Sequence, residues 1–304
     1  HEAGVPENVL QILPGSGDVG QMITTDPQIC GVAFTGSTET AKVINRTLAN
    51  RDAPVGTFIA ETGGQNAMIV DSSALPEQVV RDVLASAFQS AGQRCSAQRM
   101  LYIQEDVYEV MLDMIRGAIE ALNIGSPKNL STDVGPVIDK KAQHSLEQHI
   151  RNQKRKGLKI WYHPKVDDER LGYFVCPTII EINSISELKR EHFGPILHVA
   201  KFAAKDLGKI VQDINATGYG LTLGLHSRIT ATKEFVERHA KVGNFYINRN
   251  QIGAVVESQP FGGEGLSGTG PKAGGPNYIA RFATERVSCV DTTAAGGNAS
   301  LLSA

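Results

Sequence analysis

The chain has 304 residues, of which 41% are hydrophobic and 20% are charged, and its formal net charge is −2. This composition is typical of a globular protein and excludes a disordered chain, while the length allows about two domains. A net charge so near zero creates no field that would gather nucleic acid, so we expect no nucleic-acid partner. The one basic run, at residues 151–159, follows a helical pattern and is interpreted as a solvated helix end.

Cysteine and histidine usage limits the chemistry further. Cys30, Cys95, Cys176 and Cys289 lie far apart and form no CxxC pair, which disfavours a disulfide framework or a zinc site and favours a cytoplasmic protein. None of the eight histidines has the spacing of a metal site, so we expect no metal. No apolar run approaches the roughly 20 residues of a transmembrane helix. There is no signal peptide, but His1 is not a natural start, so we expect a piece of a longer protein.

The first predicted element is a short strand at Val9–Leu13, which runs into GSGDVG at residues 15–20. A G-x-G-x-x-G pattern between a strand and a helix, followed by an acidic residue such as Glu39, is typical of a Rossmann dinucleotide site. The next predicted strand, Gly31–Thr35, follows so closely that the helix between must be very short. Glu39 falls within the following helix rather than at a strand end. We therefore do not interpret this pattern as an ordinary pyrophosphate loop.

The turn after Gly31–Thr35 is a better candidate for a phosphate site. We expect a helix from residues 36–38 to about Leu48, with Ser37 or Thr38 as N-cap and Glu39 in the first turn. The free N–H groups of such a helix start attract an anion, so a nucleotide phosphate could bind there. A plain strand–turn–helix cap explains the same segment equally well.

Strands and helices alternate through the rest of the chain. We predict strands at 67–70, 99–103 and 158–161, an extended stretch at 172–182, and helices at 76–90, 106–122 and 140–156. Strands that alternate with helices of this length predict an α/β fold with a parallel sheet. Cys176, which precedes Pro177 and β-branched residues, is interpreted as a structural residue in a packed strand.

Two short motifs carry the candidate chemistry: ETGGQN at residues 61–66 and GQRCSA at residues 92–97. A cysteine attacks a carbonyl carbon only as the thiolate, so Cys95 needs Arg94, backbone N–H groups or a helix end to favour the anion. Glu61 would deprotonate a water that hydrolyses the resulting thioester, which suits a carboxylate with a raised pKa. A buried structural cysteine and a helix-capping glutamate are equally consistent with the spacing.

Two later stretches are further candidates. In EHFGPI at residues 191–196, Glu191 and Phe193 are two residues apart, so on an extended chain both could face one ligand. The carboxylate could bind ribose hydroxyls and the ring could flank a flat heterocycle, although a surface loop with a core phenylalanine is the alternative. Residues 260–276 are dense in glycine, and their apolar neighbours favour a packed loop over a flexible linker.

Together these motifs resemble the aldehyde dehydrogenase superfamily, because FTGS at 34–37, ETGGQN, GQRCSA, EHFGPI and PFGG at 260–263 occur in that family's order. Within it, the chain is most similar to the L-glutamate γ-semialdehyde (pyrroline-5-carboxylate) dehydrogenase domain of bacterial proline utilisation A. Residues 61–80, 131–139, 263–278 and 292–302 carry this closer likeness. The resemblance implies the C-terminal part of that fold: half of a Rossmann-type NAD-binding domain at 1–63, a parallel-sheet α/β catalytic domain at 64–263, and a substrate anchor loop with an oligomerisation arm at 264–304.

The resemblance also implies roles for individual residues. Cys95 would form a thiohemiacetal with the aldehyde, and Glu61 would activate water. The residues that would bind NAD are Gly17, Thr35, Gly36, Ser37, Glu191 and Phe193. The residues that would bind the amino-acid end of the substrate are Ser96, Gly274, Gly275 and Phe282.

The chain departs from the family at Ala41, where many members have glycine, and we expect a packing change there. Family segments that would precede His1 supply a lysine and an oxyanion-holding asparagine, so this piece alone is expected to lose about a hundredfold or more in turnover. FAD would belong to a proline dehydrogenase domain outside this chain, and we expect a homo-oligomer. Two rival functions are an aldehyde dehydrogenase for another substrate and a non-catalytic module that uses residues 287–302 as an arm.

Overall fold

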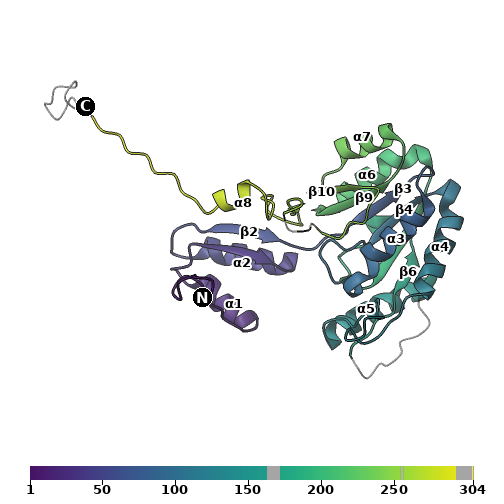
Figure 1. Cartoon of the computed structure of the whole chain (residues 1–304), viewed down its shortest axis with the longest axis horizontal. Coiled ribbons are helices and arrows are strands. Elements are labelled where there is room, and N and C mark those ends of the chain that lie inside the picture. Colours follow the sequence, from purple (N-terminus) through teal and green to yellow (C-terminus); the bar gives the residue numbers. More distant parts are fainter. Residues whose placement is uncertain (163–171, 254, 256, 292–302, 304) are drawn as a thin grey trace.

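The computed structural model describes residues 1–162, 172–253, 255, 257–291 and 303. Within them, a seven-stranded sheet of order β10-β9-β3-β4-β7-β6-β5 forms the centre of the larger part of the molecule (Figure 1). Neighbouring strands are parallel except for the antiparallel pair β5–β6. The strands are β3 (Ala67–Val70), β4 (Met100–Gln104), β5 (Ile160–Tyr162), β6 (Thr178–Glu181), β7 (Ile196–Phe202), β9 (Thr222–His226) and β10 (Asn244–Ile247).

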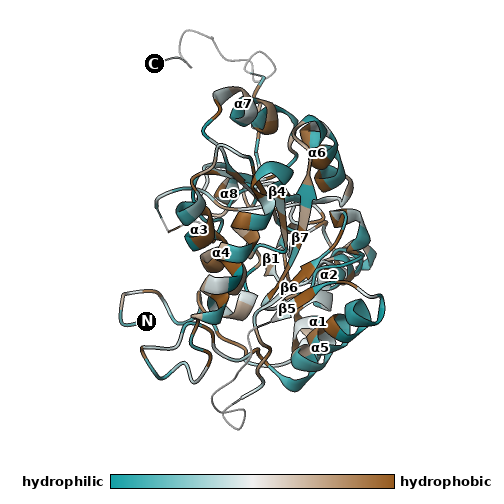
Figure 2. Ribbon diagram, turned by 90° about the vertical axis from the view of Figure 1, so that its right-hand side faces the viewer, coloured by the Kyte–Doolittle hydropathy of each residue, from teal (hydrophilic) through white to brown (hydrophobic). Residues whose placement is uncertain are grey.

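Helices pack against this sheet and bury its central strands. They are α3 (Pro76–Phe88), α4 (Tyr108–Glu120), α5 (Lys140–Arg155), α6 (Leu207–Ala216) and α7 (Thr230–His239). On α3, the buried residues Val79, Val83 and Ala87 recur every four positions and form one apolar face. Every residue of β3 and β4 is buried, as expected for parallel strands covered on both faces. Figure 2 shows the hydrophobic strands between helices that turn hydrophilic faces outward.

A smaller two-stranded sheet lies beside the large one. Its strands β1 (Gly31–Thr35) and β2 (Thr57–Glu61) are parallel, and α1 (Gly17–Thr25) and α2 (Thr38–Asn50) pack beside each other next to them (Figure 1). The register places Thr35 opposite Glu61, and Gly36 N–H donates to the Glu61 carbonyl at 3.1 Å. The turn that starts α2 therefore lies next to the end of β2.

Residues 62–66 link the two sheets, since β2 ends at Glu61 and β3 begins at Ala67. The predicted domain boundary at 63/64 falls in this link, and the domain division itself stays a prediction. The glycine-rich loop packs along the link: Thr62 N–H donates to Ser267 O at 2.9 Å, and Thr269 N–H donates to Ala60 O at 3.0 Å. Two short strands within this region, β8 (Tyr219–Gly220) and β11 (Glu264–Gly265), are antiparallel. The prediction of a packed loop is confirmed.

Most predicted elements match the structure to within a few residues, and the mostly parallel sheet is confirmed. The predicted strand at Val9–Leu13 is wrong: these residues form neither helix nor strand, and Ile12 is 89% exposed. A strand requires a neighbour for its backbone groups, and no described strand pairs with this segment. Cys176 is half-buried and precedes β6 instead of lying within a strand.

The C-terminal region begins with a short helix, α8 (Asn277–Ala280). Beyond it the chain runs away from the body of the molecule, as the yellow trace in Figure 1 shows. Residues 292–302, which carry part of the family resemblance and most of the predicted arm, lie outside the described residues. In the described part of the chain, no helix has the length and apolar character needed to cross a membrane.

Candidate active site

A cavity of about 1070 Å³ lies between the two sheets and gathers segments that are far apart in the sequence. Its walls include the start of α2, the link after β2, the turn that carries Cys95, the segment at 190–193, residues from the stretch 249–253, and Val255. Eight of the residues predicted as site residues line it: Thr35, Gly36, Ser37, Glu61, Cys95, Ser96, Glu191 and Phe193. The fold therefore brings together motifs that the sequence places up to about 160 residues apart.

Cys95 reaches the cavity because the chain turns sharply after α3. Ser90, Ala91 and Gly92 all have positive φ angles, of 55°, 54° and 64°. This left-handed conformation is unfavourable for the two residues that carry a Cβ, so the surrounding contacts must hold it. Position 92 requires glycine, both because its φ angle is positive and because a Cβ there would lie 2.2 Å from Gly194 O. The nucleophile turn thus touches the backbone of the 191–196 segment.

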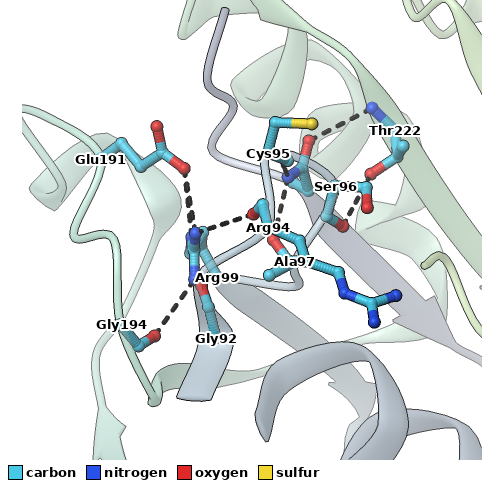
Figure 3. Close-up of polar contacts among 10 residues, drawn as sticks. Gly92, Arg94, Cys95, Ser96, Ala97, Arg99, Glu191, Gly194 and Thr222 are labelled. Atoms are coloured by element: carbon cyan, nitrogen blue, oxygen red, sulfur yellow. Dashed lines mark hydrogen bonds and ion pairs between the residues drawn. The ribbon is translucent and has the colours of Figure 1, made fainter. Parts of the chain in front are cut away.

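The side chain of Asn66, the last residue of ETGGQN, binds the backbone of the turn that carries Cys95. Its Nδ2 donates to Cys95 O at 2.7 Å and to Ala97 O at 2.9 Å, while its Oδ1 accepts from Thr222 N at 3.2 Å. The Thr222 hydroxyl in turn donates to Ser96 O at 3.3 Å (Figure 3). Three backbone carbonyls of the turn are therefore fixed by side chains from the link and from β9.

The environment of Cys95 favours the neutral thiol over the thiolate. Burial raises the pKa of the thiol, and the carboxylates of Glu191 and Glu61 raise it further, although the Ser96 N–H opposes them. Of the groups expected to favour the anion, the backbone N–H of Ser96 lowers the pKa of the thiol, whereas Arg94 Nε donates to the Ser90 hydroxyl at 3.1 Å. Figure 3 shows the Arg94 guanidinium directed away from the sulfur.

Glu61 lies at the cavity wall in an environment suited to a base. Its Oε2 accepts from Gly263 N–H at 3.0 Å, and its Oε1 is buried without a hydrogen-bond partner. Burial raises the pKa of the carboxyl to about 7, against the opposing effects of the Gly263 N–H and the Lys272 ammonium. A carboxylate that titrates near neutrality can accept a proton from water at physiological pH.

Glu191 and Phe193 form another wall. The Glu191 carboxylate lies against the backbone of the link, since a Cβ on Gly63 would lie 1.8 Å from its Oε2. Arg99 Nη2 donates to Glu191 Oε1 at 3.0 Å and makes an ion pair with it. Burial raises the pKa of Glu191, while Arg99 and the Gly64 N–H oppose the rise. The Phe193 ring is 44% exposed and borders the open cavity.

The residues predicted to bind the substrate's amino-acid end are more dispersed. Ser96 is buried, and its Oγ accepts from Gly253 N–H at 3.0 Å. Gly274 and Gly275 are outside the cavity wall, but they directly follow Ala273, which pairs with the cavity residue Phe261.

Two further predicted residues lie away from the cavity. Phe282 is 48% exposed, and a Cβ on Gly31 would be 3.5 Å from its ring, so it lies beside β1. Gly17 is exposed at the first residue of α1. Neither belongs to the cavity wall, and both assignments stay predictions.

Several residues of this site were not singled out by the sequence. Asn66 and Arg99 organise the nucleophile turn, and the walls also include Tyr219, Arg249 and Asn250. One signal was available for Arg99, since a charged residue directly before the apolar run MLYI is unusual on a buried strand. Within the described residues, no group of His, Cys, Asp or Glu side chains is arranged to hold a metal ion.

Comparisons with known proteins agree with this geometry. The chain is 55% identical over 294 residues to the bifunctional protein PutA of Klebsiella aerogenes, covering 94% of this chain and 22% of that protein. A crystal structure of a mutant Bradyrhizobium japonicum proline utilization A has a TM-score of 0.91 at 52% identity, with 97% of this chain and 30% of that chain covered. The 1-pyrroline-5-carboxylate dehydrogenase from Thermus with bound NAD has a TM-score of 0.84 at 35% identity, with 92% and 55% covered.

The chain therefore spans less than a third of the PutA proteins and about half of the Thermus enzyme. The model of the aldehyde dehydrogenase family matches residues 1–287, which is nearly the whole chain. On this match, and on the shared fold, the chain belongs to the aldehyde dehydrogenase family.

Proposed function

We propose that the protein oxidises L-glutamate γ-semialdehyde to L-glutamate with NAD, the second step of proline breakdown. The observation that carries the proposal is that Cys95, Glu61 and Glu191, from three separate segments, line one cavity. Relatives that carry the names PutA and 1-pyrroline-5-carboxylate dehydrogenase support the substrate.

The residues at the cavity fit a dinucleotide. The first turn of α2 opens toward the cavity with Thr35, Gly36 and Ser37 at its mouth, and its N–H groups suit a phosphate. The Glu191 carboxylate suits ribose hydroxyls, and Phe193 suits the edge of a flat ring. When bound, NAD would supply the acceptor for the hydride that the aldehyde carbon loses. Gly17 is proposed to lie toward the adenosine half.

Cys95 and Glu61 would perform the protein's part of the chemistry. The Cys95 sulfur forms a bond to the aldehyde carbon while the thiol proton passes to the carbonyl oxygen, which gives a thiohemiacetal. This adduct becomes a thioester once its carbon has lost the hydride and its hydroxyl group has lost the proton. Glu61 then takes a proton from a water molecule as its oxygen attacks the thioester carbon. The carbon–sulfur bond breaks, the acid leaves, and the Cys95 thiolate is regenerated.

The substrate's α-carboxylate would bind near Ser96, Gly274 and Gly275, with Phe282 against its carbon chain. Ser96 and Phe261 both line the cavity, and Ala273, directly before the two glycines, pairs with Phe261, which supports this placement for the glycines. A dehydrogenase for another aldehyde is the nearest rival, and a panel of aldehydes separates the two. Higher kcat/KM for an aliphatic aldehyde than for the semialdehyde would favour the rival.

We further propose a homo-oligomer and a bifunctional parent protein. Ile279, Val287 and Val290 are at least 80% exposed beyond the glycine-rich loop, and such apolar side chains are suited to a subunit contact. FAD would belong to a proline dehydrogenase domain outside this chain. The non-catalytic module is a second candidate, and titration with NAD tests it, because a module that only mediates assembly would not bind the dinucleotide.

The direct test of the catalytic proposal is Cys95→Ala in the complete protein. We expect NADH production to fall by about a thousandfold or more, because no other group replaces the nucleophile. Cys30→Ala is the matched control, since Cys30 is exposed at the start of β1 and outside the cavity; its rate should stay within about twofold of wild type. Retained NADH production in Cys95→Ala would refute the assignment.

A further inference from the structure

Arg99 connects the two sides of the site through a buried guanidinium. The residue is only 2% exposed, and it directly precedes β4. Its Nη1 donates to Gly92 O at 2.6 Å and to Gly194 O at 3.1 Å. Its Nη2 donates to Arg94 O at 3.2 Å and to Glu191 Oε1 at 3.0 Å, and its Nε lies 3.4 Å from the same oxygen (Figure 3).

These acceptors belong to two different segments. Gly92 and Arg94 are in the turn that carries Cys95, whereas Glu191 and Gly194 are in the 191–196 segment. A guanidinium is planar and presents its donors in a fixed fork, so the five contacts set the position of one segment relative to the other. A lysine has a single ammonium and cannot reproduce this spread of donors.

The Glu191 carboxylate is also confined from its other side. Its Oε2 faces the backbone of Gly63, where even a methyl group would lie 1.8 Å away. Arg99 and the link after Glu61 therefore hold the carboxylate between them. Any shift of the nucleophile turn that moves Arg99 would also move the carboxylate that faces the cavity.

We propose that Arg99 is a positioning residue, which keeps the Cys95 turn and the Glu191 carboxylate in one fixed arrangement across the cavity. The inference rests on the proposed function, in which Cys95 is the nucleophile and Glu191 binds the cofactor. Arg99 touches neither substrate nor cofactor in this role. It acts through the carbonyls of the turn and through the carboxylate.

The test compares Arg99→Met and Arg99→Lys with Glu191→Gln in the complete protein. The readouts are the Kd for NAD by titration and the hydrogen–deuterium exchange of residues 90–97. In Arg99→Met we expect the Kd to rise about tenfold or more and the exchange to accelerate about tenfold, because both segments lose their donor. Arg99→Lys should show intermediate values, since it keeps a charge for Glu191 but loses most of the carbonyl contacts.

Glu191→Gln separates positioning from a simple loss of cofactor contacts. It should raise the Kd for NAD while the exchange of residues 90–97 stays within about twofold, because Arg99 still donates to Gly92 and Arg94. Arg116→Met is the control for removal of an arginine, since Arg116 is a partly exposed residue on α4 paired with Asp113. It should leave both readouts unchanged.

Two results would overturn the inference. One is an Arg99→Met or Arg99→Lys protein with native circular dichroism whose Kd and exchange both match wild type; if the methionine variant fails to fold, the lysine variant decides. The other is faster exchange with an unchanged Kd, which would make Arg99 a structural residue of the turn alone. Both differ from failure of the proposed function, which appears as retained turnover in Cys95→Ala.

Discussion

At the scale of single residues, Glu61 shows how burial changes the pKa of a carboxyl group and so its ability to act as a base. Its carboxyl loses water contacts without gaining a full set of partners, so its pKa rises to about 7 from an ordinary value of 4.5. Only the Gly263 N–H and the charge of Lys272 oppose that rise. Burial acts on Cys95 in the same sense and raises its pKa also. The sequence indicated which two side chains would react, but the balance of burial and neighbouring charge depends on the folded cavity.

The raised pKa of Glu61 predicts a pH dependence for thioester hydrolysis. The carboxyl accepts a proton only when ionised, so hydrolysis in a single turnover should be slow below pH 6 and should rise through about pH 7 to a plateau. Glu61→Gln should release about one equivalent of NADH and then stop, because the thioester persists. The control is Glu264→Gln, which changes an exposed glutamate next to Gly263 and should leave the pH dependence of hydrolysis unchanged. A rise centred near pH 4.5 would contradict the role of burial.

At the scale of elements, the start of α2 combines a structural and a binding role. Ser37 Oγ accepts from Thr40 N–H at 3.1 Å and caps the helix, while Ser37 also lines the cavity. Ser37→Ala should lower the free energy of unfolding by about 1 kcal/mol and weaken NAD binding, whereas Ser37→Gly should cost only a few tenths. Arg46→Ala, at an exposed position in the same helix, should change neither by more than a few tenths of a kcal/mol, because arginine and alanine have similar helix propensities. Equal effects of alanine and glycine would exclude the cap as the cause.

Element prediction from the sequence succeeded where the signal is local. The strand at Gly31–Thr35 and the proline at the start of α3 are found as predicted, and of the two predicted N-cap residues, Ser37 and Thr38, Ser37 caps α2. These signals all act within a few residues. The segment Val9–Leu13 failed because its apolar residues indicate a strand without indicating a partner strand, and no described strand supplies one. Composition alone does not tell which strands pair.

The same limit applies to the candidate site. ETGGQN and GQRCSA are readable as motifs, but the contact of Asn66 with Cys95 O and the contacts of Arg99 with Glu191 cross 29 and 92 residues of sequence. These pairings follow from the register of β3 beside β4 and from the close approach of Gly92 to Gly194. Their existence depends on the assembled sheet, which no local pattern describes.

At the scale of the whole molecule, three histidines join α5, β7 and the 191–196 segment. His149 on α5 has its Nε2 2.9 Å from His198 Nε2 on β7, and its ring stacks on His192 with centroids 3.5 Å apart. His198 Nδ1 lies 3.0 Å from Arg99 O. Burial is the first cause that lowers the pKa of each ring, to about 4 for His149, about 3 for His198 and about 2 for His192. The cluster is therefore neutral when folded, at any pH above about 5.

This cluster predicts loss of stability in mild acid. Below pH 6.5, the ordinary value, the unfolded histidines bind protons that the folded ones do not, so the free energy of unfolding falls as the pH decreases from about 6.5 toward 4. His149 alone should account for roughly 2 kcal/mol of this loss by pH 4.5. Urea midpoints measured from pH 8 to pH 4.5 should show the fall. His149→Gln should reduce the slope by about a third, because His192 and His198 keep their lowered pKa values. The exposed His239→Gln on α7 should leave the slope unchanged, and an equally steep slope in His149→Gln would mean that the acid sensitivity has its origin elsewhere.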